Sequence, residues 1–330
     1  MSELHKFIFD GLPVRGQFVR LTDAWQDVLR RRAANTQTGA YPPPVAELLG
    51  EMTAAAVLMQ VGIKFDGALV LQVGLHLGHG QLDRAEVQTD LRLRATASLG
   101  AAVPPGANLA DMVNAHGKGR CAITLDARSR QPGQQPYQGV VPLVGEGGEP
   151  LGSLAGVIEH YMRQSEQLDT TLVLAADEQV AAGLLIQRLP VQGETNLSQS
   201  NVAREDEAGE EAEDDYQRIA ILTRSLKREE LLSLDTDTVL RRLFWEEKLL
   251  RFEPQARARG PRFACSCSRE RVAAMLQGLG QQEAESILAE QGVIEVGCDF
   301  CGHQERFDAV DVGRLFTPAQ DLPPATPSIQ

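Results

Sequence analysis

The chain has 330 residues, of which 43% are hydrophobic and only 5% aromatic, so it is long enough for one sizeable core and a smaller unit. Asp and Glu number 45 against 32 Lys and Arg, and the formal net charge of −13 argues against general binding to nucleic acids or anionic membranes. No apolar run approaches the roughly 18–20 residues that span a bilayer, and no basic region leads into an apolar stretch near the N-terminus, so we expect a cytosolic protein without a membrane partner.

Residues 1–190 have the pattern of one mixed α/β domain. The helix candidate Val45–Met59 has a second half that is apolar on nearly every side, so we expect it to be buried. A second helix candidate, Ser153–Leu168, has one apolar and one charged face. We expect strands at His5–Phe9, Phe18–Leu21, Ala68–Leu75, Val87–Ala97, Cys121–Leu125, Val140–Val144, Thr171–Ala175 and Val180–Leu189, with Pro190 closing the domain.

The composition changes after Pro190, and we expect residues 191–254 to form an acidic and helical linker. The run Glu205–Asp215 holds eight acidic residues and no basic one, which favours a disordered segment because like charges repel. Two amphipathic helix candidates follow, near Gln217–Leu232 and near Thr236–Leu250, the second behind a cap at Asp235. Short helices are marginal alone in water, so their apolar stripes must cover another surface.

Residues 255–316 form a cysteine-containing unit, and residues 317–330 form a proline-containing tail that we expect to fray. Four of the five cysteines lie in this unit as two close pairs, Cys265-Ser266-Cys267 and Cys298-Asp299-Phe300-Cys301-Gly302, thirty residues apart. Two such pairs can converge on one tetrahedral metal, and a closed all-cysteine site is typical of structural zinc. The same pairs can also close into two short disulfides, so a static zinc module and a redox switch both remain open.

The segment between the two cysteine pairs fits two short helices. Ser268 can cap the first helix, and Gly278 or Gly280 can end it. The second helix is expected at Gln282–Glu290, with Gly292 as its stop.

The first cysteine pair has a single residue between its thiols, so a disulfide there would close a small, strained ring. Strained, exposed disulfides are typically labile or regulatory. A metal would hold the sulfurs as thiolates, which are the species that oxidants attack. Structural zinc contributes ~10–16 kcal/mol of apparent binding free energy that is also folding free energy, so its loss should unfold this unit. The linker helices should then loosen and expose their apolar stripes.

At these motifs the sequence resembles the redox-regulated holdase chaperones known as the 33 kDa heat-shock protein, or 33 kDa chaperonin, family. The most specific part of the resemblance is the cysteine region, and the match covers nearly the whole chain. The matching segments are Cys265 to Arg271, Cys298 to Gly302, Arg15-Gly16, Val19-Arg20-Leu21, Leu48 to Glu51, Lys64 to Gly67, Tyr161 with Ser165-Glu166-Gln167, Gly183 to Gln187 with Leu189-Pro190, and Leu243-Phe244 with Glu246-Glu247.

The resemblance implies an α+β fold, with a β/α/β layered core around a buried helix, a metastable helical linker and a small zinc domain. It implies one Zn²⁺ on Cys265, Cys267, Cys298 and Cys301 in the reduced, inactive form. Oxidation would form the disulfides Cys265–Cys267 and Cys298–Cys301, release zinc and unfold the linker. The protein would then be an ATP-independent holdase rather than an enzyme, with its core serving dimerisation and the binding of unfolded client proteins.

Three features depart from the family pattern. Gln81 stands where proline is common after the Gly78-His79-Gly80 turn, and Glu305 stands where an aromatic residue is common. The acidic run in the linker resembles an extension. None removes a metal ligand, but all three bear on linker stability and on the activation threshold.

Other reactive residues have simpler interpretations. Cys121 lies in a strand-like stretch and is expected to be a buried small hydrophobe rather than a fifth redox thiol. His303 could in principle replace a ligand, but four cysteines are already available. His76 and His79 have no Ser or Asp partners that would indicate catalysis.

Two other function classes remain open from the residues. A zinc-ribbon protein that binds nucleic acid or acts as a scaffold is one, although residues 255–315 carry seven arginines, no lysine and nine acids, a net charge of about −2. A thiol–disulfide oxidoreductase built on Cys298 and Cys301 is the other, but a thioredoxin-like pattern does not surround that pair.

Overall fold

The structure, a computed structural model, describes residues 1–35, 38–74, 82–100, 102–114, 117–129, 133–145, 147–190 and 202–317. It divides into two compact units, Met1–Ala264 and Cys265–Gln330. Residues 191–201 of the expected linker, residues 318–330 of the expected tail, and Leu75, His76, Gly78, His79, Gly80 and Gln81 lie outside the described residues. The domain boundaries expected at 190, 254 and 316 stay predictions.

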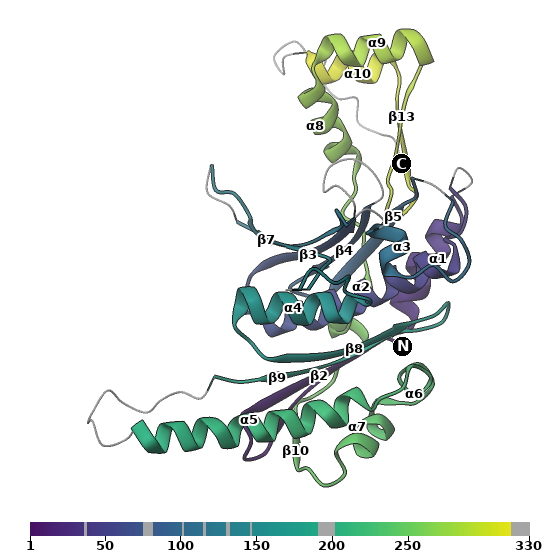
Figure 1. The fold of residues 1–330 in the computed structure, drawn as a ribbon. Helices are drawn as coiled ribbons and strands as arrows, with labels where there is room; N and C mark the ends of the chain where they lie inside the picture. The colour runs from purple at the N-terminus through teal and green to yellow at the C-terminus, as the bar shows by residue number, and fades with distance from the viewer. Residues whose placement is uncertain are drawn as a thin grey trace. The chain divides into compact units, whose positions relative to one another are not determined.

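The first unit contains two six-stranded sheets (Figure 1). The first sheet consists of β1 (Glu3–Phe9), β2 (Val14–Leu21), β8 (Thr170–Ala176), β9 (Ala181–Arg188), β10 (Leu249–Arg251) and β11 (Gln255–Ala256). Its order is β10-β1-β2-β9-β8, with β11 also paired to β1, and every pair is antiparallel.

The second sheet consists of β3 (Gly67–Gly74), β4 (Leu82–Gln88), β5 (Arg92–Ser98), β6 (Arg120–Ala127), β7 (Tyr137–Pro142) and β12 (Arg262–Phe263). Its order is β12-β5-β4-β3-β6-β7. Only β12, which follows the short 3₁₀ turn η1 (Arg257–Arg259), runs parallel to its neighbour. The expected single strand over Val87–Ala97 is wrong, because Leu91 adopts a left-handed φ of +62° and the chain turns back as the β4–β5 hairpin.

Helix α2 (Pro43–Gly62) lies between the two sheets, so the layers are β/α/β (Figure 1). It contacts β2, β8 and β9 on one side and β3, β4 and β5 on the other. Pro43 at its first position suits a helix start because its φ is already fixed and no N–H partner is needed. The expected α+β fold and the expected burial of this helix are confirmed.

The length of α2 corrects one expectation. The helix has 20 residues and a mean hydropathy of 1.3 over an 18-residue window, so by length and composition alone it could cross a membrane. We expected no apolar run of that size. Since 78% of the window is buried inside the protein, its apolar surface is covered in the manner of a core helix.

Three further helices belong to the layered core: α1 (Asp23–Ala33), α3 (Leu109–Val113) and α4 (Leu154–Glu166). The expected helix near Ser153–Leu168 is confirmed as α4, and the Ser153 hydroxyl accepts a hydrogen bond from the Gly156 N–H as its cap. The sequence patterns did not predict α1 or α3.

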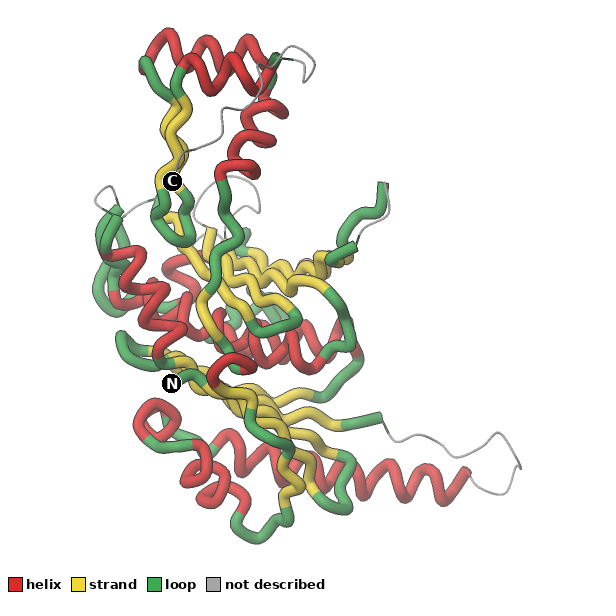
Figure 2. The backbone as a smooth tube through the Cα atoms, turned by 180° about the vertical axis from the view of Figure 1, so that it is seen from behind, coloured by secondary structure: helices red, strands yellow, loops and turns green. Residues whose placement is uncertain are grey.

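The linker region forms α5 (Val202–Arg224), α6 (Arg228–Ser233) and α7 (Thr236–Phe244), which cover the face of the first sheet opposite α2 (Figure 2). The interface is apolar and buried. The helices contribute Tyr216, Ile219, Leu231, Val239, Leu240, Leu243 and Phe244, and the sheet contributes Phe7, Phe9, Phe18, Leu184 and Ile186. The apolar stripes expected in the linker helices are therefore buried against the first sheet.

Three expectations for the linker need correction. The acidic run Glu205–Asp215 is helical, as part of α5, rather than disordered. The helix expected near Gln217–Leu232 is interrupted between Arg224 and Arg228, and the one expected near Thr236–Leu250 ends at Phe244, after which the chain enters β10. The cap at Asp235 is confirmed, since its carboxylate accepts the Thr238 N–H at 2.9 Å.

The second unit contains α8 (Arg269–Leu279), α9 (Gln281–Gln291), the hairpin of β13 (Ile294–Gly297) and β14 (Gln304–Phe307), and α10 (Ala309–Phe316). The two helices expected between the cysteine pairs are confirmed, with Ser268 as cap and with Gly280 and Gly292 as stops. Its buried core is small and consists of Leu276, Ala284, Ile294, Phe307 and Val312.

Candidate metal centre

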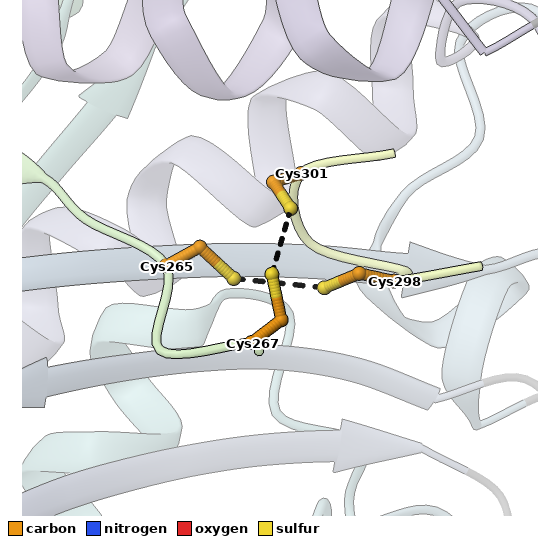
Figure 3. A group of neighbouring side chains, drawn as sticks. All are labelled: Cys265, Cys267, Cys298 and Cys301. Atoms are coloured by element: carbon orange, nitrogen blue, oxygen red, sulfur yellow. Dashed lines mark hydrogen bonds between the residues drawn. The ribbon is translucent and has the colours of Figure 1, made fainter. Parts of the chain in front are cut away.

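The four cysteines of the second unit meet at one point (Figure 3). The Sγ atoms of Cys265, Cys267, Cys298 and Cys301 all lie within 4.8 Å of one another. Two contacts run between the pairs: 3.5 Å from Cys265 to Cys298 and 3.3 Å from Cys267 to Cys301. A disulfide requires about 2.05 Å, so these are free thiols.

Two short loops bring the sulfurs together. Cys265 and Cys267 lie between β12 and the start of α8, and Cys298 and Cys301 lie at the tip of the β13–β14 hairpin. At that tip the Gly302 N–H donates to the Cys298 carbonyl at 2.8 Å, and Gly302 has a φ of +72°. A side chain would be strained in that conformation, so glycine permits the tight turn that points both thiols inward.

The geometry fits a tetrahedral tetrathiolate site. Metal–sulfur bonds of about 2.3 Å in a tetrahedron give sulfur–sulfur separations of about 3.8 Å. Two separations here, 3.5 Å and 3.3 Å, are slightly shorter than that value, and all six lie within 4.8 Å. The four cysteines could therefore hold a metal ion with only small side-chain adjustments. In such a cluster every sulfur is close to every other, so the reduced geometry does not select a disulfide pairing.

The thiols do not ionise independently. Burial acts to raise the pKa of Cys265, but the Cys267 N–H and the three neighbouring thiols stabilise its anion and lower that pKa to about 7. Burial and the neighbouring sulfurs raise the pKa of Cys267, and burial above all raises the pKa of Cys298 to about 11. One thiol therefore ionises first, and its negative charge opposes ionisation of the other thiols. A bound cation would relieve that repulsion.

Arg269, the first residue of α8, supports the site from outside. Its guanidinium lies 2.8 Å from Asp311, 3.3 Å from Glu305 and 4.2 Å above the Phe307 ring. It thereby ties α8 to β14 and α10. The sequence patterns did not identify this role, because the acids and the ring are more than thirty residues away along the chain.

Two other sequence candidates are not part of the centre. Cys121 is fully buried in β6 of the first unit, and burial raises the pKa of its thiol to about 12, which is typical of an inert thiol. His303 is exposed and lies 3.0 Å from Glu305, and among the described residues it does not join the group of possible metal ligands.

Comparison with known proteins identifies relatives along nearly the whole chain. The family model described as Hsp33 protein matches residues 2–308. A 33 kDa chaperonin of Chromobacterium violaceum is 42% identical over 317 residues, covering 96% of this chain and 94% of the relative. One from Neisseria meningitidis serogroup A is 38% identical over 315 residues, covering 94% and 90%.

Among solved structures, the fold is similar to that of a 33 kDa chaperonin (heat shock protein 33 homolog) from Thermotoga maritima. The TM-score is 0.71, at 19% sequence identity, with 96% of this chain and 98% of that chain covered. At that identity the likeness bears on the fold alone.

Proposed function

This chain belongs to the Hsp33 family of chaperones, and on that premise we propose that it is an ATP-independent holdase controlled by oxidation of its four-cysteine metal centre. The relatives are named as chaperonins and not as enzymes, so neither a thiol–disulfide oxidoreductase nor a nucleic-acid-binding zinc ribbon is favoured. The single observation that carries the proposal is the convergence of four free thiols within 4.8 Å in a unit with a very small core.

The metal in this proposal is one Zn²⁺ held by Cys265, Cys267, Cys298 and Cys301 in the reduced protein. Four thiolates in a closed tetrahedron are a donor set that zinc favours. The bound metal would supply folding free energy to the second unit, whose five buried core residues are too few for a stable fold of their own.

Oxidation would reverse this arrangement. Forming each disulfide removes two electrons from two thiolates. Forming both Cys265–Cys267 and Cys298–Cys301 therefore consumes two molecules of hydrogen peroxide and four protons and produces four molecules of water. A disulfide sulfur is a poor metal ligand, so Zn²⁺ leaves as the hydrated ion. The second unit then loses its main source of stability.

Activation in this proposal reaches the linker layer along the chain. Cys265 lies two residues after β12, and β10 and β11 lie between α7 and β12 along the chain. Release of α5, α6 and α7 would uncover the apolar residues that they and the first sheet now bury against each other. Surfaces of that kind bind unfolded client proteins. We propose further that the oxidised protein is a homodimer and acts in the cytoplasm.

The test compares reduced, zinc-loaded protein with peroxide-treated protein for suppression of aggregation of a thermally unfolding enzyme. We expect protection from the oxidised form only, with one zinc released and four thiols lost per chain. A metallochromic indicator, a thiol count and light scattering measure these quantities on the same sample. Size-exclusion chromatography with light scattering measures the dimer.

The matched controls are Cys301→Ser and Cys121→Ser. Cys301→Ser removes one ligand and should abolish stoichiometric zinc binding, whereas Cys121→Ser changes a buried thiol outside the centre and should keep zinc and switching. Equal protection by reduced and oxidised wild-type protein would show that the centre is not a switch.

A further inference from the structure

A pocket of the first unit lies outside the metal centre and the linker layer. It has a volume of about 350 Å³, in the range typical of small-ligand sites, and is lined by both sheets and by the ends of α2 and α4. Its apolar part is formed by Leu58, Ile63, Ile123, Leu125, Leu168 and Leu185. The pocket also has a few polar side chains, and these indicate which polar groups a ligand would need.

Arg15 is the cation of the pocket. Its Nε donates to the Gln187 Oε1 at 3.0 Å and its Nη2 to the Gly62 carbonyl at 3.3 Å, which positions the guanidinium at the C-terminal end of α2. Among the described residues no carboxylate lies within ion-pair distance of Arg15, and its Nη1 has no hydrogen-bond acceptor. The side chain is half-buried, and burial lowers its pKa. A half-buried cation that lacks an ion pair favours an anionic partner.

Gln17 is the second polar group and is only 3% exposed. Its Oε1 is buried and has no hydrogen-bond partner among the described residues. Residues 15 and 17 share one face of β2, and a Cβ added at Gly62 would lie 3.5 Å from both Arg15 Nη2 and Gln17 Nε2. A side-chain amide with an unsatisfied acceptor therefore lies near a cation that has no ion pair.

Glu166 is the anion of the pocket, but it has hydrogen-bond donors of its own. The Tyr161 hydroxyl donates to it at 2.7 Å and the Tyr137 hydroxyl at 3.5 Å. Both charges have neutral hydrogen-bond partners, but Glu166 is exposed to water whereas Arg15 is half-buried, so Arg15 is the charge that gains more from an oppositely charged ligand. Arg15, Tyr161, Glu166 and Gln187 come from segments that carry the family resemblance, and the metal centre uses none of them.

We propose that this pocket binds the C-terminal residue of a polypeptide whose last side chain is apolar. The carboxylate accepts from Arg15, the last amide N–H donates to the Gln17 Oε1, and the side chain fills the apolar part. Free N-acyl amino acids share this chemistry. The assignment to client chains rests on the proposed chaperone function, whereas the ligand chemistry rests on the pocket alone.

The test titrates N-acetyl-L-leucine into the reduced, metal-loaded full-length protein and follows binding by calorimetry or by chemical-shift changes. The matched ligand is N-acetyl-L-leucinamide, which keeps the side chain and the N–H but lacks the carboxylate. We expect the amide to bind at least about tenfold more weakly, because a charge-assisted hydrogen bond is lost. Because no oxidant is used, failure here leaves the redox proposal untouched.

Variants locate the site. Arg15→Gln should weaken binding of the acid by roughly tenfold to hundredfold and bring it close to that of the amide. Leu125→Trp should block the apolar part and abolish binding. Arg163→Gln removes an exposed charge on α4 and should leave binding unchanged. Circular dichroism and the thermal midpoint show whether each variant is folded. If Arg15→Gln does not fold, the folded Leu125→Trp variant still tests whether the ligand binds in this pocket.

A hexapeptide ending in leucine distinguishes the two sources of the ligand. Binding of the free-acid hexapeptide, with much weaker binding of its C-terminal amide, supports a site for polypeptide ends. Binding of N-acetyl-L-leucine without binding of the hexapeptide overturns that assignment. Equal affinity for acid and amide, unchanged affinity in folded Arg15→Gln and Leu125→Trp, or no binding by wild type at millimolar ligand overturns the proposal altogether.

Discussion

Among single residues, Asp83 is the buried charge that the fold compensates least. It lies on β4 opposite Val73 and Ala97, is 1% exposed, and neither of its carboxylate oxygens has a hydrogen-bond partner among the described residues. Burial raises its pKa to about 7. The folded state therefore holds a proton that the unfolded chain, with an ordinary carboxyl pKa of about 3.9, would release.

The pH dependence follows from that difference. Between about pH 4 and pH 7 the folded state binds more protons than the unfolded state, so the free energy of unfolding falls as the pH rises. Asp83→Asn should remove this dependence and raise the stability at pH 8 by roughly 1–3 kcal/mol, since a neutral amide is cheaper to bury than a carboxylate. Urea unfolding of the first unit at pH 5 and pH 8 measures both effects.

The matched control for Asp83→Asn is Asp66→Asn, which makes the same chemical change at an exposed carboxylate. It should shift the stability by less than about 0.5 kcal/mol at either pH. A lower stability of Asp83→Asn at pH 8 would contradict the assignment, because it would mean that the carboxylate is stabilised in the fold.

Arg269 is the residue whose loss should most directly loosen the metal centre without removing a ligand. Arg269→Gln removes two ion pairs and the stacking on Phe307, and we expect the second unit to be less stable and to unfold at a lower temperature. Under the proposed function, the zinc held by the four cysteines should then transfer several-fold faster to a chelating indicator in the reduced protein. The control Arg259→Gln removes a fully exposed pair with Glu253 and should leave the transfer rate unchanged.

At the scale of elements, the linker layer is held by polar contacts as well as by its apolar interface. Arg20 of β2 donates to the carbonyls of Leu231, Leu232 and Leu234 at 2.6–3.1 Å, where α6 ends. Carbonyls at a helix end have no partner inside the helix, and a cation there is also favoured by the helix dipole. Arg20 thus connects the core to the shortest linker helix.

We expect Arg20→Gln to loosen α6 in the reduced protein by roughly 1–3 kcal/mol, because charged donors to three carbonyls are lost. Under the proposed function, less oxidant is then needed to release the linker. Limited proteolysis between residues 225 and 250 and aggregation assays over a peroxide series measure this. Arg241→Gln, which changes an exposed arginine of α7, is the control. Unchanged protease sensitivity of Arg20→Gln would rule out its role in holding α6.

The helical state of the acidic run also has its reason at this scale. In α5 the acids precede Arg218 and Arg224, so negative charge is concentrated in the N-terminal half and positive charge near the C-terminal end. This order complements the helix dipole. The last part of the helix is buried through Ile219 and Ala220, and the Tyr216 hydroxyl is hydrogen-bonded to Thr171 at 2.9 Å. Docking at one end therefore favours helix along the whole segment.

For the whole molecule, the two units differ in what stabilises their folded state. The first has a large core that includes most of α2, whereas the second has five buried residues among those described and the candidate metal site. Removal of the metal from reduced protein by a chelator should therefore unfold the second unit while α2 and both sheets stay folded. Zinc contributions of ~10–16 kcal/mol exceed what so small a core can replace.

Hydrogen exchange measures metal removal unit by unit. We expect amides of α8, α9 and α10 to lose protection on chelation, whereas those of α2, β3 and β9 keep it. Adding back zinc to the reduced protein should restore protection. If α8 and α9 remain protected without metal, the second unit is stable by itself and the centre cannot act as its switch.

The amino-acid sequence by itself determined the features that depend on neighbours along the chain. The spacing of the cysteine pairs, the caps at Ser268 and Asp235, and the helix stop at Gly292 involve residues a few positions apart, so their patterns were enough to predict them. The burial of α2 also followed, because a helix that is apolar all round has no face suited to water.

Only the tertiary structure decided the features that join distant segments. The helical state of the acidic run and the support of the candidate metal centre by Arg269 each depend on contacts that no local pattern contains. The same is true of the pocket in which Arg15, Gln187 and Tyr161 meet. Local propensities are worth fractions of a kcal/mol per residue, whereas burial against a distant partner is worth several, so packing overrides them.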